Sequence, residues 1–237
     1  MISFVVPAYN EELLLGATLR GLHAAAQTLG ESYEIIVVDD ASTDRTVAVA
    51  EEHGARVVQV ACRQIAGARN AGGRAAQGDF LIFVDADTRV NPPVVRAAIE
   101  AMRNGAVGGG CNFEFDGRVP LWARLLIFPS RWLYWVARLA SGAFLFCTRQ
   151  AFDAAGGFNA ELYAAEEAAM SRALRRQGRF VVLRESVVTS GRKLRAYSAG
   201  EILGLLSRLA LTGGQGVRKR EGLDIWYGAR REDPERS

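Results

Sequence analysis

Short apolar segments that alternate with helix-forming segments dominate the first part of the chain. The expected strands cover residues 3–6, 34–38, 56–60 and 80–84, and the expected helices cover residues 10–29, 45–53, 66–76 and 92–104. This alternation is typical of βα units, which build a parallel sheet with helices on both faces. The sequence therefore predicts an α/β protein with a doubly wound, mostly parallel sheet flanked by helices.

Local signals set the boundaries of these elements. Asn10 is a favourable N-cap residue, and Glu11 and Glu12 would then lie in the first turn of the first helix. The small residues of the 66–76 helix predict close packing against the sheet. Later in the chain, the expected elements are a strand over 107–115, a helix over 198–211 and a charged tail from Arg218.

Acidic residues follow two of the expected strands. Asp39 and Asp40 follow the second strand, and Asp85 and Asp87 follow the fourth. In open parallel sheets, ligands bind beyond the carboxyl ends of the strands. Two carboxylates one residue apart can converge on Mg²⁺ or Mn²⁺, which bind through one or two carboxylates together with substrate phosphates. The pattern indicates a metal-assisted diphosphate site, and solvated loop acids or helix caps are the alternative.

Composition and missing motifs exclude several other classes of protein. With 49% hydrophobic and 23% charged residues the chain is globular, and a net charge of +3 without zinc-finger spacing does not predict nucleic-acid binding. Cys62, Cys111 and Cys147 form no CxxC pair, which favours buried thiols in a reducing compartment. The N-terminus has no signal-peptide pattern, so a cytoplasmic location is expected. Neither GxGxxG nor GxxxxGK[ST] occurs.

Residues 121–140 are apolar and aromatic, but arginines interrupt them. Arg124, Arg131 and Arg138 recur every seven residues and would form one stripe on a helix, which a membrane-spanning helix would not carry. Pro129 would break or kink such a helix. Two interpretations stay open: a helix pair that covers the core, or an interfacial surface that contacts anionic lipid on the cytoplasmic face.

Five stretches of the sequence, in their order and spacing, resemble the family-2 glycosyltransferases of the GT-A fold. The resemblance extends from residue 1 to about residue 180. It implies a GT-A type α/β fold with a mixed, mostly parallel sheet, a nucleoside-diphosphate sugar as donor, inversion by single displacement, and Mn²⁺ or Mg²⁺ as cofactor. The stretches are "VVPAYNEE" (5–12), "EIIVVDDASTDRT" (34–46), "GARNAGGRAAQGDFLIFVDADT" (67–88), "SGAFLFCTRQAFDAAGGFN" (141–159) and "EEAAMSRALRRQGR" (166–179).

The resemblance also implies which residues bind the nucleotide. Tyr9 would lie near the base, Glu11 near the ribose, and Asp40 would accept a hydrogen bond from the base. Arg69 and Asn70 would contact the base and the phosphates. The full expected set is Pro7, Tyr9, Glu11, Asp40, Arg69, Asn70 and Asp85.

Metal and catalytic roles follow from the same comparison. Asp87 would contact the metal directly, and Asp85 would contact the ribose or a metal-bound water. The pair Glu166-Glu167 stands where the family has Glu-Asp, so Glu167 would remove the proton from the acceptor hydroxyl with a side chain one methylene longer. The alternative is a pair of acids that interact with the dipole of the following helix.

The acceptor side and the diphosphate side carry further expectations. Gly156, Gly157 and Phe158 resemble the family's turn at the acceptor site, and such a sharp turn needs positive φ. Many GT-A enzymes add a late histidine to the metal, but His53 is the last histidine here. Arg192 and Lys193 are therefore expected to contact the diphosphate.

These expectations divide the chain into a catalytic domain, residues 1–190, and a helical extension with a charged tail, residues 191–237. Within the first, residues 1–105 would bind the nucleotide sugar and residues 106–190 the acceptor, which the aromatic segment suggests is lipid-linked. A nucleotidyltransferase is not favoured, because residues 5–12 contain no glycine. A non-catalytic nucleotide-sugar-binding protein stays open.

Overall fold

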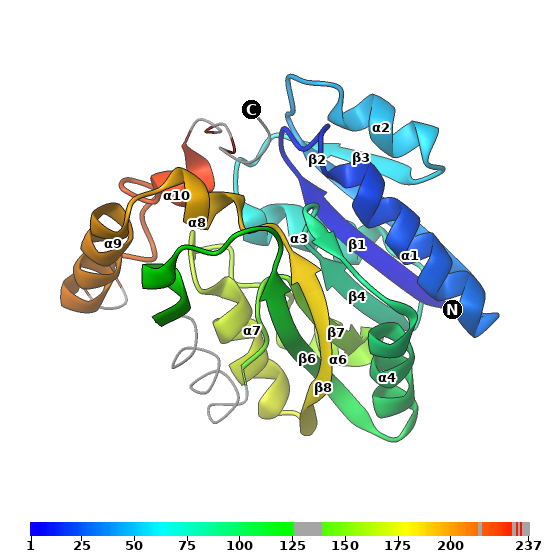
Figure 1. Ribbon diagram of the computed structural model, residues 1–237. Helices are drawn as coiled ribbons and strands as arrows, with labels where there is room; N and C mark the ends of the chain where they lie inside the picture. The colour runs from blue at the N-terminus through cyan, green and yellow to red at the C-terminus, as the bar shows by residue number, and fades with distance from the viewer. Residues whose placement is uncertain (126–138, 213–214, 229–230, 232, 234–237) are drawn as a thin grey trace.

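The computed structural model describes residues 1–125, 139–212, 215–228, 231 and 233 (Figure 1). One twisted sheet with helices on both faces forms its centre. The strands are β1 (Ile2–Ala8), β2 (Tyr33–Asp40), β3 (Arg56–Val60), β4 (Phe80–Val84), β5 (Thr88–Arg89), β6 (Ala106–Phe115), β7 (Phe144–Thr148) and β8 (Arg179–Thr189). The helices are α1 (Leu15–Leu29), α2 (Thr46–Glu52), α3 (Ile65–Ala75), α4 (Pro92–Arg103), α6 (Arg149–Ala155), α7 (Glu166–Arg175), α8 (Arg192–Ala196), α9 (Ala199–Thr212) and α10 (Asp224–Tyr227).

The sheet is mixed, with strand order β3-β2-β1-β4-β7-β6-β8-β5. Strands β3, β2, β1 and β4 pair with one another in parallel. Strand β7 is antiparallel to both β4 and β6, while β8 is parallel to β6. The predicted α/β class and mixed sheet are confirmed. Strands from residues 1–105 and from residues 106–190 belong to this one sheet. The assignment of donor binding to the first range and acceptor binding to the second stays a prediction.

Two apolar cores cover the two faces of the sheet. Phe4 and Val6 of β1 face the core made with α1, α2 and α4, whereas Val5 faces the core made with α3, α6 and α7. Strands buried on both faces read as continuous apolar runs, which explains their strong sequence signal. A Cβ on Gly72 would lie 2.3 Å from Val5 Cγ1, so α3 packs closely on the sheet as predicted.

The predicted N-cap at Asn10 is wrong. Helix α1 begins at Leu15, and Asn10 has φ of 51°. The backbone N–H of Asn10 donates to Ser42 Oγ, and its side-chain oxygen accepts from the N–H of Thr43, at 3.0 and 2.8 Å. The N–H of Glu11 donates to Thr46 Oγ1 at 2.8 Å. These contacts bind the backbone of Asn10 and Glu11 to the segment that follows β2. The two residues therefore do not join the helix, which begins four residues later than Glu11.

Part of the predicted 121–140 segment can be located. Residues 121–125 are helical, and Leu121 and Leu125 are each 77% exposed. Residues 126–138 lie outside the described residues, so the arginine stripe and Pro129 are not placed. Among the helices that the structure describes, none combines the length and the hydropathy needed to cross a membrane.

Candidate active site

A cavity of about 540 Å³ opens at the carboxyl ends of β1, β2 and β4. Its lining combines charged side chains with apolar and aromatic side chains, several of which come from β6, α9 and α10. Of the site residues predicted from sequence, those that line the cavity are Pro7, Tyr9, Glu11, Asp40, Arg69, Asp85, Asp87, Glu166 and Glu167, together with Arg192 and Lys193. The edge of the sheet predicted to bind ligand therefore carries most of the expected residues.

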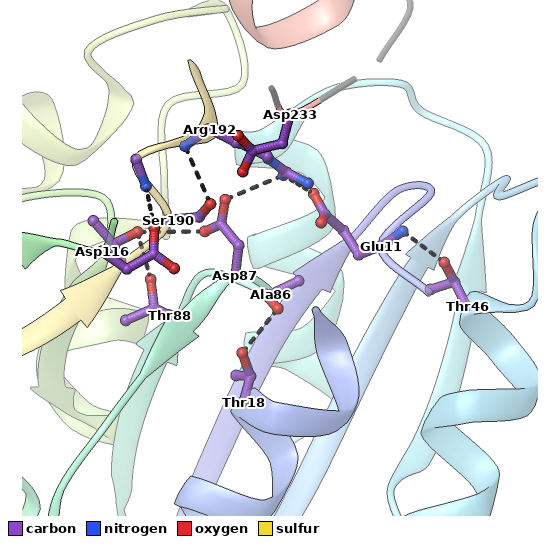
Figure 2. Close-up of polar contacts among 12 residues, drawn as sticks. Glu11, Thr18, Thr46, Ala86, Asp87, Thr88, Asp116, Ser190, Arg192 and Asp233 are labelled. Atoms are coloured by element: carbon purple, nitrogen blue, oxygen red, sulfur yellow. Dashed lines mark hydrogen bonds and ion pairs between the residues drawn. The ribbon is translucent and has the colours of Figure 1, made fainter. Parts of the chain in front are cut away.

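Asp87 is held by the junction between β8 and α8 (Figure 2). The N–H of Ser190 donates to the Asp87 carbonyl at 3.1 Å, and Thr189 Oγ1 lies 3.4 Å from Asp87 Oδ1. Arg192 donates from Nη2 to Asp87 Oδ2 at 3.1 Å, and the same nitrogen ion-pairs with Glu11. One guanidinium from late in the chain thus pairs with two carboxylates from its N-terminal half.

The backbone of the Asp85–Asp87 turn is fixed from below. Thr18 Oγ1 of α1 donates to the carbonyl of Ala86 at 2.8 Å, as Figure 2 shows. The N–H of Thr88 closes the turn by donating to the Asp85 carbonyl at 3.0 Å. This turn directs the Asp87 carboxylate toward α8 and leaves the Asp85 carboxylate for α3.

Arg69 of α3 meets Asp85 on that other side. Its side chain is 3% exposed and donates from Nη2 to Asp85 Oδ1 at 2.8 Å and to the carbonyl of Gly142 at 3.0 Å. Its Nη1 donates to Glu166 Oε1 at 2.7 Å. Burial alone would lower the pKa of Arg69, but the charges of Asp85 and Glu166 raise it above its usual value. The guanidinium therefore stays charged at every physiological pH.

Glu167 is the second acid of the predicted catalytic pair. Burial and the neighbouring charge of Glu166 raise its pKa well above the ordinary 4.5, although Arg69 opposes the shift. Burial likewise raises the pKa of Asp85 against the attraction of Arg69. A carboxyl group that exchanges its proton closer to neutral pH is suited to general acid–base chemistry.

Asp40 and Tyr9 line the cavity together with Arg63, a residue that was not predicted from sequence. Asp40 accepts from the N–H groups of Arg63 and Gln64, at 2.8 and 2.9 Å, and so fixes the backbone just before α3. The guanidinium of Arg63 stacks 3.7 Å from the centre of the Tyr9 ring. Arg63 has φ of 48° in an irregular segment, and no motif marked it.

Asn70 and the glycine turn lie outside the lining of the cavity. Asn70 Oδ1 accepts from the N–H of Phe158 at 2.7 Å, and its Nδ2 donates to the Phe158 carbonyl at 2.8 Å. Gly156 and Gly157 have φ of 73° and 78°, which confirms the predicted turn. These residues shape the chain that leads into Glu166, and their predicted direct contacts with ligands stay predictions.

The apolar and aromatic part of the lining was also missed. It is built by Phe113, Phe115, Trp122, Ile202, Leu206, Ile225, Trp226 and Tyr227. Tyr227 donates from its hydroxyl to the carbonyl of Tyr163 at 2.8 Å and so fastens the C-terminal segment near α7. The sequence predicts an apolar helix at α9 followed by a charged tail. It does not indicate that the segment with Tyr227 folds back against the residues before α7.

The fold and this cavity define a protein of the GT-A type. The mannosyltransferase PcManGT from Pyrobaculum calidifontis, solved with GDP-Man and Mn²⁺, matches with a TM-score of 0.68 at 17% identity, covering 95% of this chain and 66% of that one. Residues 1–349 of TarS from S. aureus, solved with UDP, match with a TM-score of 0.65 at 20% identity, covering 94% and 68%. At these identities the likeness concerns the fold.

Sequence comparison gives the family. The profile described as Glycosyl transferase family 2 matches residues 3–160, and the chain belongs to that family, as its sequence predicted. An undecaprenyl-phosphate 4-deoxy-4-formamido-L-arabinose transferase of Pseudomonas paraeruginosa is 38% identical over 138 residues, which are 55% of this chain and 40% of the relative. A dolichol-phosphate mannosyltransferase of Pyrococcus furiosus is 32% identical over 145 residues, 59% and 41%. The matches span about two fifths of each relative.

The position of Asn70 gives a first prediction. Asn70→Ala removes two hydrogen bonds to Phe158 in a buried site, so the free energy of unfolding should fall by about 2 kcal/mol. Nucleotide affinity should stay within about twofold at a temperature where the variant is folded, because Asn70 does not line the cavity. Denaturant unfolding and calorimetry measure the two quantities. Asn104→Ala, at an exposed position, is the control; a large loss of affinity with unchanged stability would contradict the assignment.

Proposed function

We propose that the chain transfers a sugar, with inversion, from a nucleoside-diphosphate sugar to an acceptor hydroxyl, assisted by Mn²⁺ or Mg²⁺. One observation carries the proposal: Asp87 and Glu167 line the same cavity at the carboxyl ends of the strands, in a family-2 fold. Neighbours solved with UDP, or with GDP-Man and Mn²⁺, support the donor and the metal. Relatives named for undecaprenyl phosphate and dolichol phosphate, together with the apolar and aromatic lining residues of the cavity, support a lipid-linked acceptor.

The residues present suit a hard divalent cation. Asp87, Asp85 and Glu11 offer carboxylate oxygens, the ligand type that Mg²⁺ and Mn²⁺ prefer. Within the described part of the chain, no group of three His, Cys, Asp or Glu side chains converges as a complete ligand set. Diphosphate and water would therefore have to supply the other ligands. When bound at Asp87, the cation would neutralise charge on the departing diphosphate.

The chain's own groups would divide the remaining work. Tyr9, Arg63 and Asp40 would surround the base. Glu167 would hold the acceptor hydroxyl and take its proton as the sugar moves. Arg192, with Lys193, would donate to the diphosphate, since both line the cavity beside Asp87.

Removal of the metal carboxylate tests the function. Asp87→Asn should reduce the release of nucleoside diphosphate from UDP-, GDP- or dTDP-sugars with Mn²⁺ by about 100-fold, because the leaving group loses its charge stabilisation. Asp153→Asn, at an exposed position of α6, should leave the rate unchanged. Tight nucleotide-sugar binding without release by the wild-type chain would instead support the non-catalytic binding protein.

The basic pair of α8 gives a second test. Replacing Arg192 and Lys193 by alanine should weaken nucleoside-diphosphate binding about tenfold or more, since charge-assisted hydrogen bonds contribute about 1.5–3 kcal/mol each. Isothermal calorimetry with UDP and GDP measures the effect. Arg218→Ala with Lys219→Ala removes the same charges outside the cavity and is the control. An intact affinity in the α8 variant would remove these residues from the donor site.

We also propose peripheral contact with the cytoplasmic face of a membrane. Exposed leucines lie on the two helical segments that contribute Trp122 and Leu206 to the cavity, namely residues 121–125 and α9: Leu121, Leu125, Leu203, Leu206 and Leu211. Leu121→Ser with Leu125→Ser should reduce co-sedimentation with phosphatidylglycerol vesicles, because burying these side chains in the interface is favourable. Leu13→Ser, which alters an equally exposed leucine outside the cavity, is the control. A wild-type chain that ignores anionic vesicles would contradict the contact.

A further inference from the structure

Arg69 connects the two ends of the candidate active site. It contacts Asp85 after β4, Glu166 at the start of α7 and the carbonyl of Gly142 before β7. These partners lie 16, 97 and 73 residues away in the chain. The guanidinium also lies 5.4 Å from the centre of the Phe158 ring, which Asn70 holds in place. Arg69 is therefore enclosed by elements of both the donor side and the acceptor side.

The chemistry of the guanidinium makes this contact rigid. Its donors form a planar fork with fixed spacing, and it keeps its charge in proteins. Nη2 directs its hydrogens to Asp85 and Gly142, while Nη1 directs one to Glu166. The side chain expected to contact the nucleotide thus points to protein carboxylates. Both acids line the cavity, but Glu166 is 6% exposed in this ion pair, whereas Glu167 is partly exposed.

We propose that Arg69 is a positioning residue that fixes the spacing between Asp85 and the Glu166-Glu167 pair, with Glu166 as its counter-ion and Glu167 as the base. The inference rests on the proposed function, because it needs a proton acceptor at the acceptor side. Its new content is the role of Arg69 and of its counter-ion Glu166, which couple the acidic pair to the donor carboxylate.

The charges that face Glu167 give this proposal a measurable signature. They are Glu166 on its own helix, Arg69 on α3 and Asp85 after β4. The base must be deprotonated, so kcat/KM falls as the pH drops through its pKa. Arg69→Met removes an attractive charge and should move this acid limb to higher pH, whereas Glu166→Gln removes a repulsive charge and should move it to lower pH.

The experiment measures kcat/KM against pH, together with UDP and GDP affinity, for the wild type and these variants. Arg69→Met should lower kcat about 100-fold, as expected for misplaced groups, with nucleotide affinity within about twofold. Arg69→Lys keeps the charge but loses the fork, so its acid limb should stay near the wild-type pH while kcat falls. Thermal unfolding identifies any variant that fails to fold, and Glu166→Gln, with a side chain of the same shape, then carries the test.

Three results would overturn the proposal. Loss of nucleotide affinity in Arg69→Met with an unmoved pH profile would make Arg69 a nucleotide contact. Loss of the acid limb in Glu166→Gln would make Glu166 the base. A ¹³C-carboxyl NMR titration of Glu167, assigned with Glu167→Gln, needs no turnover, so it separates failure of the proposed function from failure of this inference. The proposal would also be contradicted if the pKa of Glu167 stayed the same in Arg69→Met and Glu166→Gln, or if it moved in the same direction in both variants.

Discussion

The buried ion pairs of Arg69 are the contact on which the rest of the site depends. Moving the Arg69 guanidinium and the Glu166 carboxylate out of water costs several kcal/mol per ion, and only close pairing offsets that cost, whereas the Asp85 side chain stays 35% exposed. Here the offset comes from Asp85 and Glu166, at 2.8 and 2.7 Å. If Arg69 were removed, two carboxylates would remain beneath the cavity without the cation that they share. Strand β4, helix α3 and helix α7 are therefore held in one arrangement by electrostatics as well as by their apolar cores.

Features with local physical causes were predictable from sequence. The sequences of β1, β2 and β4 are apolar because both faces of these strands are buried. Helix α3 contains glycine where it packs against the sheet, because a larger side chain would collide with Val5. Features that depend on distant partners were not. Strands β7 and β8 pair with segments far away in the chain, and Asn10 follows Ser42 and Thr43 instead of its own helical preference.

The same distinction applies to the candidate site. Motif order located the Asp85–Asp87 turn and the Glu166-Glu167 pair, because each follows a recognisable strand or opens a helix. Side-chain direction is a tertiary property, so sequence did not reveal that Asn70 turns to Phe158 or that Arg63 stacks on Tyr9. The aromatic residues of α10 escaped notice because they lie in a mostly charged segment, whose return to the sheet depends on contacts such as that between Tyr227 and Tyr163.

The anchoring of α8 has a consequence for the speed at which the site responds. Arg195 donates to both carboxylate oxygens of Asp233, at 2.8 and 2.6 Å, and to the carbonyl of Asp116 at 2.7 Å, so the helix is fastened at its far side. Arg192 extends from that fastened helix to Asp87 and Glu11. When a new charge appears near Asp87, rotation of the Arg192 side chain is then enough to compensate it. Rotamer changes are orders of magnitude faster than helix displacements, so charge compensation at this end need not limit turnover.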